Sequence, residues 1–217
     1  IASFLGFEYP KNSHTLDLFW EVGCFIVSLL GLVIRILVSG SVPAGTSGRN
    51  TNRQKADYLN TTGLYSIVRH PLYLGNYLIT LGASFVPRHW FLPIIVSLGF
   101  ILYYERIIFK EEEFLENKFG EEFRNWAKHT HAIIPRFKNY EPSRLPFKWK
   151  AALRKEYHTV FGITSAFFWL DIIGDFFIYK ETKLDFIWTP LFVISLVFYL
   201  LVRAIKNKTN LLEVVGR

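Results

Sequence analysis

Sulfur-containing residues are scarce in this sequence. It has one cysteine, Cys24, and no methionine among 217 residues. A single cysteine excludes an intrachain disulfide and a cysteine-rich zinc cluster, and because Cys24 lies in an apolar run we expect a small buried residue. No set of His, Cys and Asp residues has the spacing of metal ligands, so we predict no metal centre. The sequence begins at Ile1, so we expect the true start to lie upstream and infer nothing about a signal peptide.

Charge is also limited and unevenly spread. Charged residues make up 20% of the chain, whereas 51% is hydrophobic and 18% aromatic. Such a chain is too apolar for a soluble domain unless the charges are segregated. The net charge is +7, and the basic residues that cause it lie between apolar runs. This pattern argues against a nucleic-acid partner and favours a protein in an anionic membrane.

Five apolar runs follow one another along the chain. They cover about residues 17–38, 71–86, 90–109, 157–179 and 184–205. A membrane-spanning helix needs about 20 residues, so four runs qualify and the second is short. We predict an all-α fold over residues 1–217: a single-domain, polytopic integral-membrane bundle of about five transmembrane helices.

The connecting segments predict the orientation of this bundle. Lys and Arg number four in residues 39–70 and eleven in 110–156, but one in 87–89 and two in 180–183. Basic loops stay on the cytoplasmic side, so we predict an outside N-terminus and an inside C-terminus. After the third run, Phe114, Phe119 and Phe123 recur at near-helical spacing. They predict a cytoplasmic amphipathic helix along the membrane surface, with Gly120 as an interruption.

Arg69-His70-Pro71 precedes the second apolar run. Pro suits the first turn of a helix, so a helix should begin near Pro71, with its N–H groups and positive dipole end beside Arg69. That is an anion site on the cytoplasmic side. The first turns carry Tyr73, Gly75 and Asn76, and Gly75 lets another group approach the backbone closely. Alternatively, Arg69 and His70 only anchor a helix end among lipid headgroups.

A second polar cluster, Glu111-Glu112-Glu113, follows the third run. It is either a solvated face or a site for a cation or for sugar hydroxyls, which carboxylates accept in hydrogen bonds. The second run starts inside and the third ends inside, so Arg69-His70 and Glu111-Glu112 should meet. An anion pocket beside carboxylates suits a zwitterionic ligand that carries a ribose.

Together the two clusters resemble the integral-membrane methyltransferases of the isoprenylcysteine carboxyl methyltransferase and phospholipid methyltransferase superfamily. The resemblance rests on "RHPLYLG", then "EEEFLENKFG", an aromatic pair and Ile-Pro. The pair is usually tyrosine in the family, and here it is Phe123 and Trp126. The similarity covers residues 40–137 as a shared catalytic core, with residues 157–205 as two additional spans.

The resemblance implies S-adenosylmethionine as cofactor, held between the two motifs. The implied catalytic residues are Arg69 and Glu112. The implied cofactor-binding residues are Tyr65, His70, Pro71, Leu72, Tyr73, Gly75, Asn76, Glu111, Glu112 and Pro135. The chemistry agrees with this, because a helix N-terminus suits the cofactor's carboxylate, a glutamate suits ribose hydroxyls, and aromatic side chains suit adenine. Methyl transfer depends largely on positioning and needs no metal.

The loop before the first motif is rich in hydrogen-bond donors. Arg binds phosphate in forked geometry, so we predict that Arg49, Asn50, Arg53 and Arg69 bind the methyl acceptor. This stretch also resembles bacterial lipid A phosphate methyltransferases, which implies a phosphate oxygen on a lipid headgroup at the bacterial inner membrane. The alternative acceptors are a C-terminal prenylcysteine carboxylate and the amine of phosphatidylethanolamine. The loop could instead be merely attracted to anionic lipid. An alternative class is a non-catalytic lipid-binding or channel-like protein. The oligomeric state stays open.

Two carboxylates fall inside the fourth apolar run. Asp171 and Asp175 are four residues apart, on one face of a helix. Intramembrane carboxylates suggest function by default, but we expect these two to pack against a polar partner such as Arg35 or Glu21.

Overall fold

The computed structural model describes residues 14–43, 56–180, 184–214 and 216, and these residues form an all-helical protein. Its helices are α2 (His14–Ser41), α3 (Pro71–Phe85), α4 (Phe91–Phe119), α5 (Glu121–His129), α6 (Trp149–Tyr179) and α7 (Trp188–Lys208). Two short 3-10 turns, η2 (Leu64–Ser66) and η3 (Phe137–Asn139), lie in the loops. Among the described residues there is no strand, only an isolated bridge between Gly63 and Glu141. The predicted all-α fold is confirmed.

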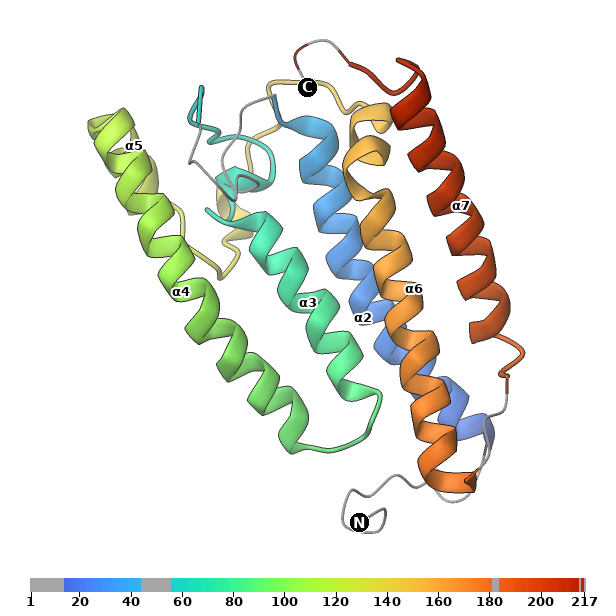
Figure 1. Cartoon of the computed structure of the whole chain (residues 1–217). Coiled ribbons are helices and arrows are strands. Elements are labelled where there is room, and N and C mark those ends of the chain that lie inside the picture. The colour runs from blue at the N-terminus through green and yellow to red at the C-terminus, as the bar shows by residue number, and fades with distance from the viewer. Residues whose placement is uncertain (1–13, 44–55, 181–183, 215, 217) are drawn as a thin grey trace.

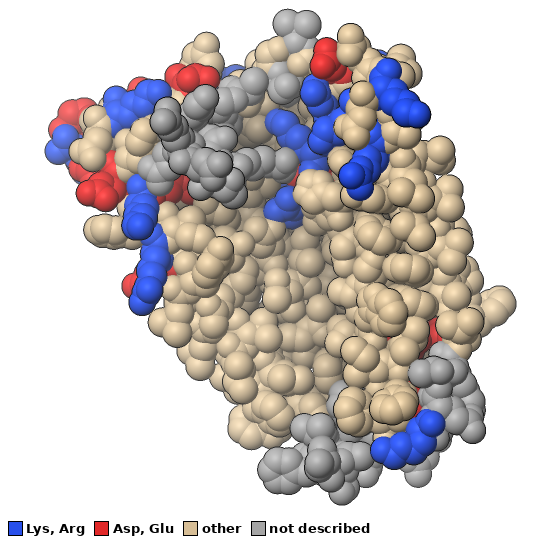
Figure 2. All heavy atoms as spheres, viewed as in Figure 1, with Lys and Arg blue, Asp and Glu red and all other residues tan. Residues whose placement is uncertain are grey.

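The five long helices stand side by side in the order α4, α3, α2, α6 and α7 (Figure 1). The most extensive contact is that of α2 with α3, and α6 packs on α2 and α7. Consecutive helices alternate in direction, so the first turn of α3 and the last turns of α4 lie at one end. We call this the charged end, because charged side chains gather there above a broad apolar belt (Figure 2).

Four helices are long and apolar enough to cross a membrane. They comprise Leu18–Ser41, Phe91–Phe119, Trp149–Phe177 and Trp188–Lys208. Helix α3 has only 15 residues, as the short second run predicted, although it stands among the others. Ile95, Leu98 and Leu102 on α4 are more than half exposed, as expected of a surface that lipid covers. The protein is thus a multi-pass membrane protein, whereas the five-span topology and its orientation stay predictions.

Small residues let α2 and α3 approach closely. A Cβ atom added at Gly75 would lie 2.7 Å from Cγ of Arg35 and 2.8 Å from the carbonyl oxygen of Gly31. One turn further along, Ser28 donates a hydrogen bond to the Ile79 carbonyl at 2.9 Å. Small residues favour close association of helices in lipid. The group that approaches the backbone of Gly75 is therefore the neighbouring helix.

At the charged end, the chain after α5 docks against the residues that precede α3. The backbone N–H groups of Arg69 and His70 donate to the carbonyls of His131 (2.8 Å) and Ala132 (3.1 Å). The interruption predicted at Gly120 is confirmed, since it separates α4 from α5 with a φ of 54°. The apolar side of α5 faces the protein at Phe123, which is 4% exposed.

The structure corrects one of the two partners expected for Asp171 and Asp175, namely Arg35. Arg35 pairs instead with Glu156, at 2.8 Å between Nε and Oε2. The reason is that α2 and α6 run antiparallel, which places Glu156 at the level of Arg35 and the two aspartates at the other end. Glu21 is their electrostatic neighbour, as expected, but its Oε2 accepts a hydrogen bond from Trp188.

Candidate active site

His70 brings the two motifs into contact at the charged end. It lies immediately before α3, and the two glutamates lie on the last turns of α4. Its Nε2 is 2.8 Å from Oε1 of Glu112, and its Nδ1 is 3.6 Å from Oε2 of Glu111. The side chains of His70 and Glu111 are 6% and 8% exposed. The imidazole is thus held between two carboxylates in a largely dry environment, where such contacts are strong.

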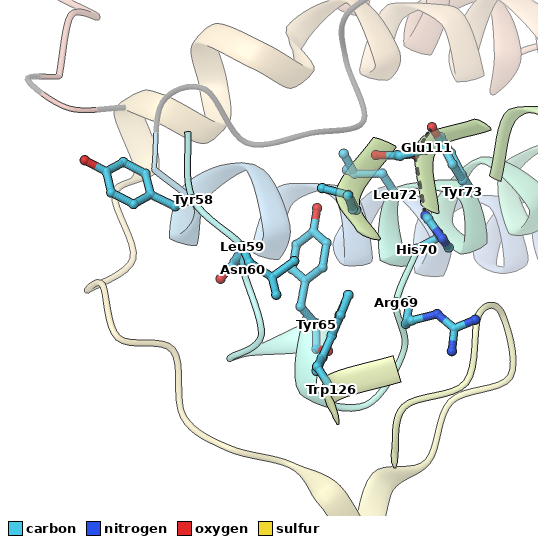
Figure 3. A pocket seen from close by; sticks show the side chains of 11 residues that line it. Tyr58, Leu59, Asn60, Tyr65, Arg69, His70, Leu72, Tyr73, Glu111 and Trp126 are labelled. Carbon is cyan, nitrogen blue, oxygen red and sulfur yellow. Dashed lines mark hydrogen bonds and ion pairs between the residues drawn. The ribbon is translucent and has the colours of Figure 1, made fainter. Parts of the chain in front are cut away.

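Arg69 makes a fork to the same carboxylate. Its Nε and Nη2 donate to the two oxygens of Glu112 at 2.8 and 3.1 Å. Its Nη1 donates to the carbonyl oxygens of Ala127 (3.0 Å) and Thr130 (2.5 Å), at the end of α5. In Figure 3 the side chain points away from Tyr65 and Trp126. The guanidinium therefore ties the first motif to both α4 and α5, in the bidentate geometry that suits arginine.

Tyr73, on the first turn of α3, joins the other glutamate. Its hydroxyl donates to Oε2 of Glu111 at 2.7 Å. Its ring stacks on His70, with centroids 5.3 Å apart and an angle of 9° between the planes, and lies 4.7 Å from the ring of Tyr104. Tyr73 therefore fixes Glu111 on the side of the site that faces the bundle.

A cavity of about 30 Å³ lies beside this cluster (Figure 3). It is lined by Tyr58, Leu59, Asn60, Tyr65, Arg69, His70, Leu72, Tyr73, Glu111, Leu115 and Trp126. A larger cavity of about 720 Å³ shares the wall formed by residues 58–60 and is also lined by Asp57, Arg144 and Lys148. The site thus combines aromatic and apolar walls with a carboxylate, an imidazole and an amide.

The structure brings many of the residues predicted from the sequence to this cavity, but not all. Glu112 is outside the cavity lining and lies behind it, holding Arg69 and His70. Pro71 is buried in the first turn of α3, and Gly75 packs against α2. Asn76 is hydrogen-bonded to Arg35 and Tyr104, away from the cavity, and Pro135 is also outside its lining. The predicted acceptor residues Arg49, Asn50 and Arg53 lie outside the described residues.

Other lining residues were not predicted from the sequence. Leu115 and Trp126 belong to the second motif, so the motif itself could have indicated them. Tyr58, Leu59 and Asn60 carry no comparable signal. They reach the site because the chain that enters η2 folds back over it.

The lining chemistry fits S-adenosylmethionine. Tyr65, Leu72 and Trp126 offer apolar surfaces for adenine, Glu111 can accept hydrogen bonds from ribose hydroxyls, and His70 can meet a carboxylate. A volume of about 30 Å³ is far below that of a nucleoside. A ligand of that size would therefore fit only if a wall of the cavity moved. Among the described residues, no group of three or more His, Cys, Asp or Glu could hold a metal ion.

Comparison with known proteins supports the resemblance found in the motifs. Residues 23–122 match the family described as phospholipid methyltransferase. The chain is 37% identical over 94 residues to the cobalt-zinc-cadmium resistance protein CzcN of Cupriavidus metallidurans, covering 43% of this chain and 41% of that protein. It is also 37% identical over 83 residues to the nickel-cobalt-cadmium resistance protein NccN of Alcaligenes xylosoxydans xylosoxydans, covering 38% of each.

A third relative is named as a methyltransferase. The protein-S-isoprenylcysteine O-methyltransferase of Schizosaccharomyces pombe is 30% identical over 100 residues, covering 45% of this chain and 42% of that protein. The chain thus spans about two fifths of the length of these curated relatives. No solved structure matches it. The family match and the third relative support the membrane methyltransferase superfamily over this part of the chain, and none of these three relatives is named as a lipid A phosphate methyltransferase.

Proposed function

We propose that this protein, whose residues 23–122 match the phospholipid methyltransferase family, is an S-adenosylmethionine-dependent methyltransferase of the membrane. The observation that carries the proposal is the meeting of the two motifs. Arg69 and His70 from one motif contact Glu112 from the other at 2.8 Å, beside an aromatic cavity. Glu112 lies 42 and 43 positions from His70 and Arg69 in the chain. The last turns of α4 and the residues just before α3 meet here, at the end that the loop charges predict to be cytoplasmic.

On this proposal, the residues of the site divide into two groups. His70, Glu111, Tyr73 and the aromatic walls hold the cofactor, which supplies a methyl group on a positively charged sulfur. Glu112 positions His70 and Arg69, because its oxygens accept three hydrogen bonds from them. No residue has to be a strong base, since much of the acceleration of such a displacement comes from holding two reactants in line.

On this proposal, the wall formed by residues 58–60 would give way when the cofactor binds. This wall separates the small cavity from the large one, so its displacement would merge the two spaces. Tyr58 is 65% exposed, so its side chain costs little to move, whereas Leu59 would have to leave its contacts with the buried cluster of Ala56, Leu115 and Phe123. The same displacement would open a path from the larger cavity to the methyl group.

The acceptor that fits best is a lipid headgroup, with a phosphate oxygen as the nucleophile. One observation favours an anionic headgroup: the larger cavity is lined by two basic side chains, Arg144 and Lys148, against one acidic side chain, Asp57. Arg49, Asn50 and Arg53 stay predicted acceptor ligands. The contacts of Arg69 favour a positioning role for it, although binding of the acceptor stays a prediction. A prenylcysteine carboxylate and the amine of phosphatidylethanolamine are the alternative acceptors.

Calorimetry on the detergent-purified protein tests the cofactor site. S-adenosylhomocysteine should bind to the wild type, and His70→Ala should weaken binding about 10- to 150-fold, the loss of a hydrogen bond that involves a charged group. His131→Ala is the matched control, because that side chain is exposed and only its backbone carbonyl contacts the site. Equal affinity of His70→Ala and wild type would refute this placement of the site.

Mass spectrometry of total lipid tests the acceptor. Cells that contain the protein should accumulate a phospholipid or glycolipid heavier by one methyl group in place of a hydrogen, and cells with a His70→Ala variant should not. Fragmentation assigns the methyl group to a phosphate oxygen or to an amine. Methylation of a small prenylcysteine analogue by the purified protein, with no change in lipid, would favour the carboxylate instead.

A further inference from the structure

A buried ion pair joins α2 to α6 away from the candidate site. Arg35 and Glu156 are 12% and 2% exposed and lie 2.8 Å apart. The carboxylate of Glu156 also accepts hydrogen bonds from Ser39 (2.5 Å) and Thr159 (2.9 Å). Charges inside an apolar bundle are costly unless they are paired, and they commonly mark function.

The other arm of Arg35 leads toward α3 and α4. Its Nη1 donates to Oδ1 of Asn76, and Nδ2 of Asn76 donates to the hydroxyl of Tyr104 at 2.9 Å. Arginine can only donate, so the amide must turn its oxygen to Arg35 and its NH₂ group to Tyr104. The orientation of Asn76, and with it the hydroxyl of Tyr104, therefore depends on the guanidinium.

Tyr104 in turn supports a wall of the cavity. Its ring lies 4.7 Å from Tyr73 and is stacked at 4.0 Å on Phe100. Tyr73 donates to Glu111, and both line the cavity. A continuous series of contacts thus runs from Glu156 on α6, which lies outside the matched residues 23–122, to the candidate site.

We propose that the Arg35–Glu156 pair positions the cofactor site: it orients Asn76 and Tyr104, and these hold Tyr73 and Glu111 in place. The expected effect of the ion pair on cofactor binding rests on the proposed function. A tie between α2 and α6 alone would be made by the ion pair and the bond from Ser39, and would not need the bonds to Asn76 and Tyr104. The extension through these two residues is what couples α6 to the site.

The test uses a variant that removes both charges and keeps the shapes. In the double variant Arg35→Met, Glu156→Gln, no unpaired charge is left in the bundle, so the protein should fold. Its affinity for S-adenosylhomocysteine should fall about fivefold, the effect of one weakened neutral hydrogen bond. Tyr104→Phe, which removes only the hydroxyl, should lower the affinity in the same direction.

The matched control is Thr164→Val, Ser195→Ala. It removes a buried 2.6 Å hydrogen bond between α6 and α7 that has no contact with the Arg35 series. Its thermal stability should fall, but its affinity for S-adenosylhomocysteine should equal that of the wild type. Unchanged affinity in the Arg35–Glu156 variant, with a stability loss like that of the control, overturns the proposal.

Hydrogen–deuterium exchange provides a readout that needs no cofactor. In the Arg35–Glu156 variant, exchange should increase in the first turns of α3, residues 71–77, whereas in the control any increase should be confined to α6 and α7. Unchanged exchange in α3 overturns the positioning role. If wild type does not bind S-adenosylhomocysteine, the proposed function fails, while the exchange result still decides whether the pair positions α3.

Discussion

At the scale of single residues, the contacts of Arg69 favour one of the two roles that its motif allows, positioning of other residues over binding of the acceptor. The sequence suggested a guanidinium available for an anionic acceptor, but all its nitrogens donate to protein oxygens of Glu112, Ala127 and Thr130. A side chain so engaged would have to give up hydrogen bonds to bind a phosphate. Its contacts are those of a positioning residue.

Arg69→Lys separates the two roles. Lysine keeps the charge but cannot make the fork to Glu112 or reach both carbonyls, so stability should fall by about 2–3 kcal/mol. If Arg69 is a positioning residue, affinity for S-adenosylhomocysteine and turnover should fall together. Calorimetry and a methylation assay measure both. Loss of turnover with wild-type affinity would instead support the predicted contact with the acceptor.

Tyr73→Phe probes the placement of Glu111. The change removes the 2.7 Å hydrogen bond to the carboxylate and keeps the ring that stacks on His70. We expect S-adenosylhomocysteine to bind about two- to tenfold more weakly, as for loss of one hydrogen bond. Tyr77→Phe on the same helix is the control, because its hydroxyl bonds to Ser97 outside the cavity lining. Similar affinities of the two variants would argue that Tyr73 does not support the site.

At the scale of elements, the close packing of α2 on α3 determines which residues of α3 face the cavity. Gly75 lies against α2, and Leu72, which reaches the edge of the cavity, also packs on Val38 of α2, whereas Tyr73 lies on another side of the helix and lines the cavity. Side chains on a helix are distributed around its axis at about 100° per residue. The side occupied by α2 is therefore unavailable to a ligand.

Gly75→Ala should weaken this helix pair. The new Cβ would lie 2.8 Å from a backbone oxygen of Gly31, which cannot move aside as a side chain can, and α2 and α3 would have to separate. We expect a drop in the thermal midpoint corresponding to about 1–3 kcal/mol, as for other overpacked sites. Gly99→Ala in α4 is the control, with no atom within 4 Å of its Cβ. It should leave stability equal or higher, since alanine favours a helix more than glycine. A higher midpoint for Gly75→Ala as well would contradict this packing.

At the scale of the whole molecule, alternation of the helices puts both motifs at one end of the bundle. The charged end holds the residues before α3 and after α4, and the turn at residues 86–90 lies at the opposite end. Helix α3 is too short to be identified as a span by length, yet the site requires it to run alongside α4. The five-span prediction therefore depends on whether α3 crosses the membrane.

Labelling of single cysteines tests this topology. In a Cys24→Ser background, Trp90→Cys, at a position 79% exposed, should react with an impermeant thiol reagent in intact cells. Lys138→Cys, at an exposed position of η3 in the loop after α5, should react only after the cytoplasmic face is opened. The reason is that Trp90 lies just before the first turn of α4, whereas Lys138 follows α5, beyond the other end of α4. Reaction of both from the same side would rule out the proposed arrangement.

The sequence by itself determined the class of fold and the two motifs of the site. Apolar runs separated by basic loops predict membrane helices because the lipid requires them, whatever their neighbours. The tight connection at residues 87–89 makes a helical hairpin, and a hairpin must bring Arg69-His70 to Glu111-Glu112. Local spacing was enough for these conclusions.

Only the tertiary structure decided which side chains meet across helices far apart in the chain. Arg35 pairs with Glu156, 121 positions away, and not with the aspartates of the same helix, because antiparallel packing sets which residues lie at one level. The same packing turned Gly75 toward α2 and Asn76 toward Arg35 and Tyr104, away from the cavity. Hydropathy and motif spacing describe each helix alone. The rotation and height of one helix against another depend on how their side chains fit together.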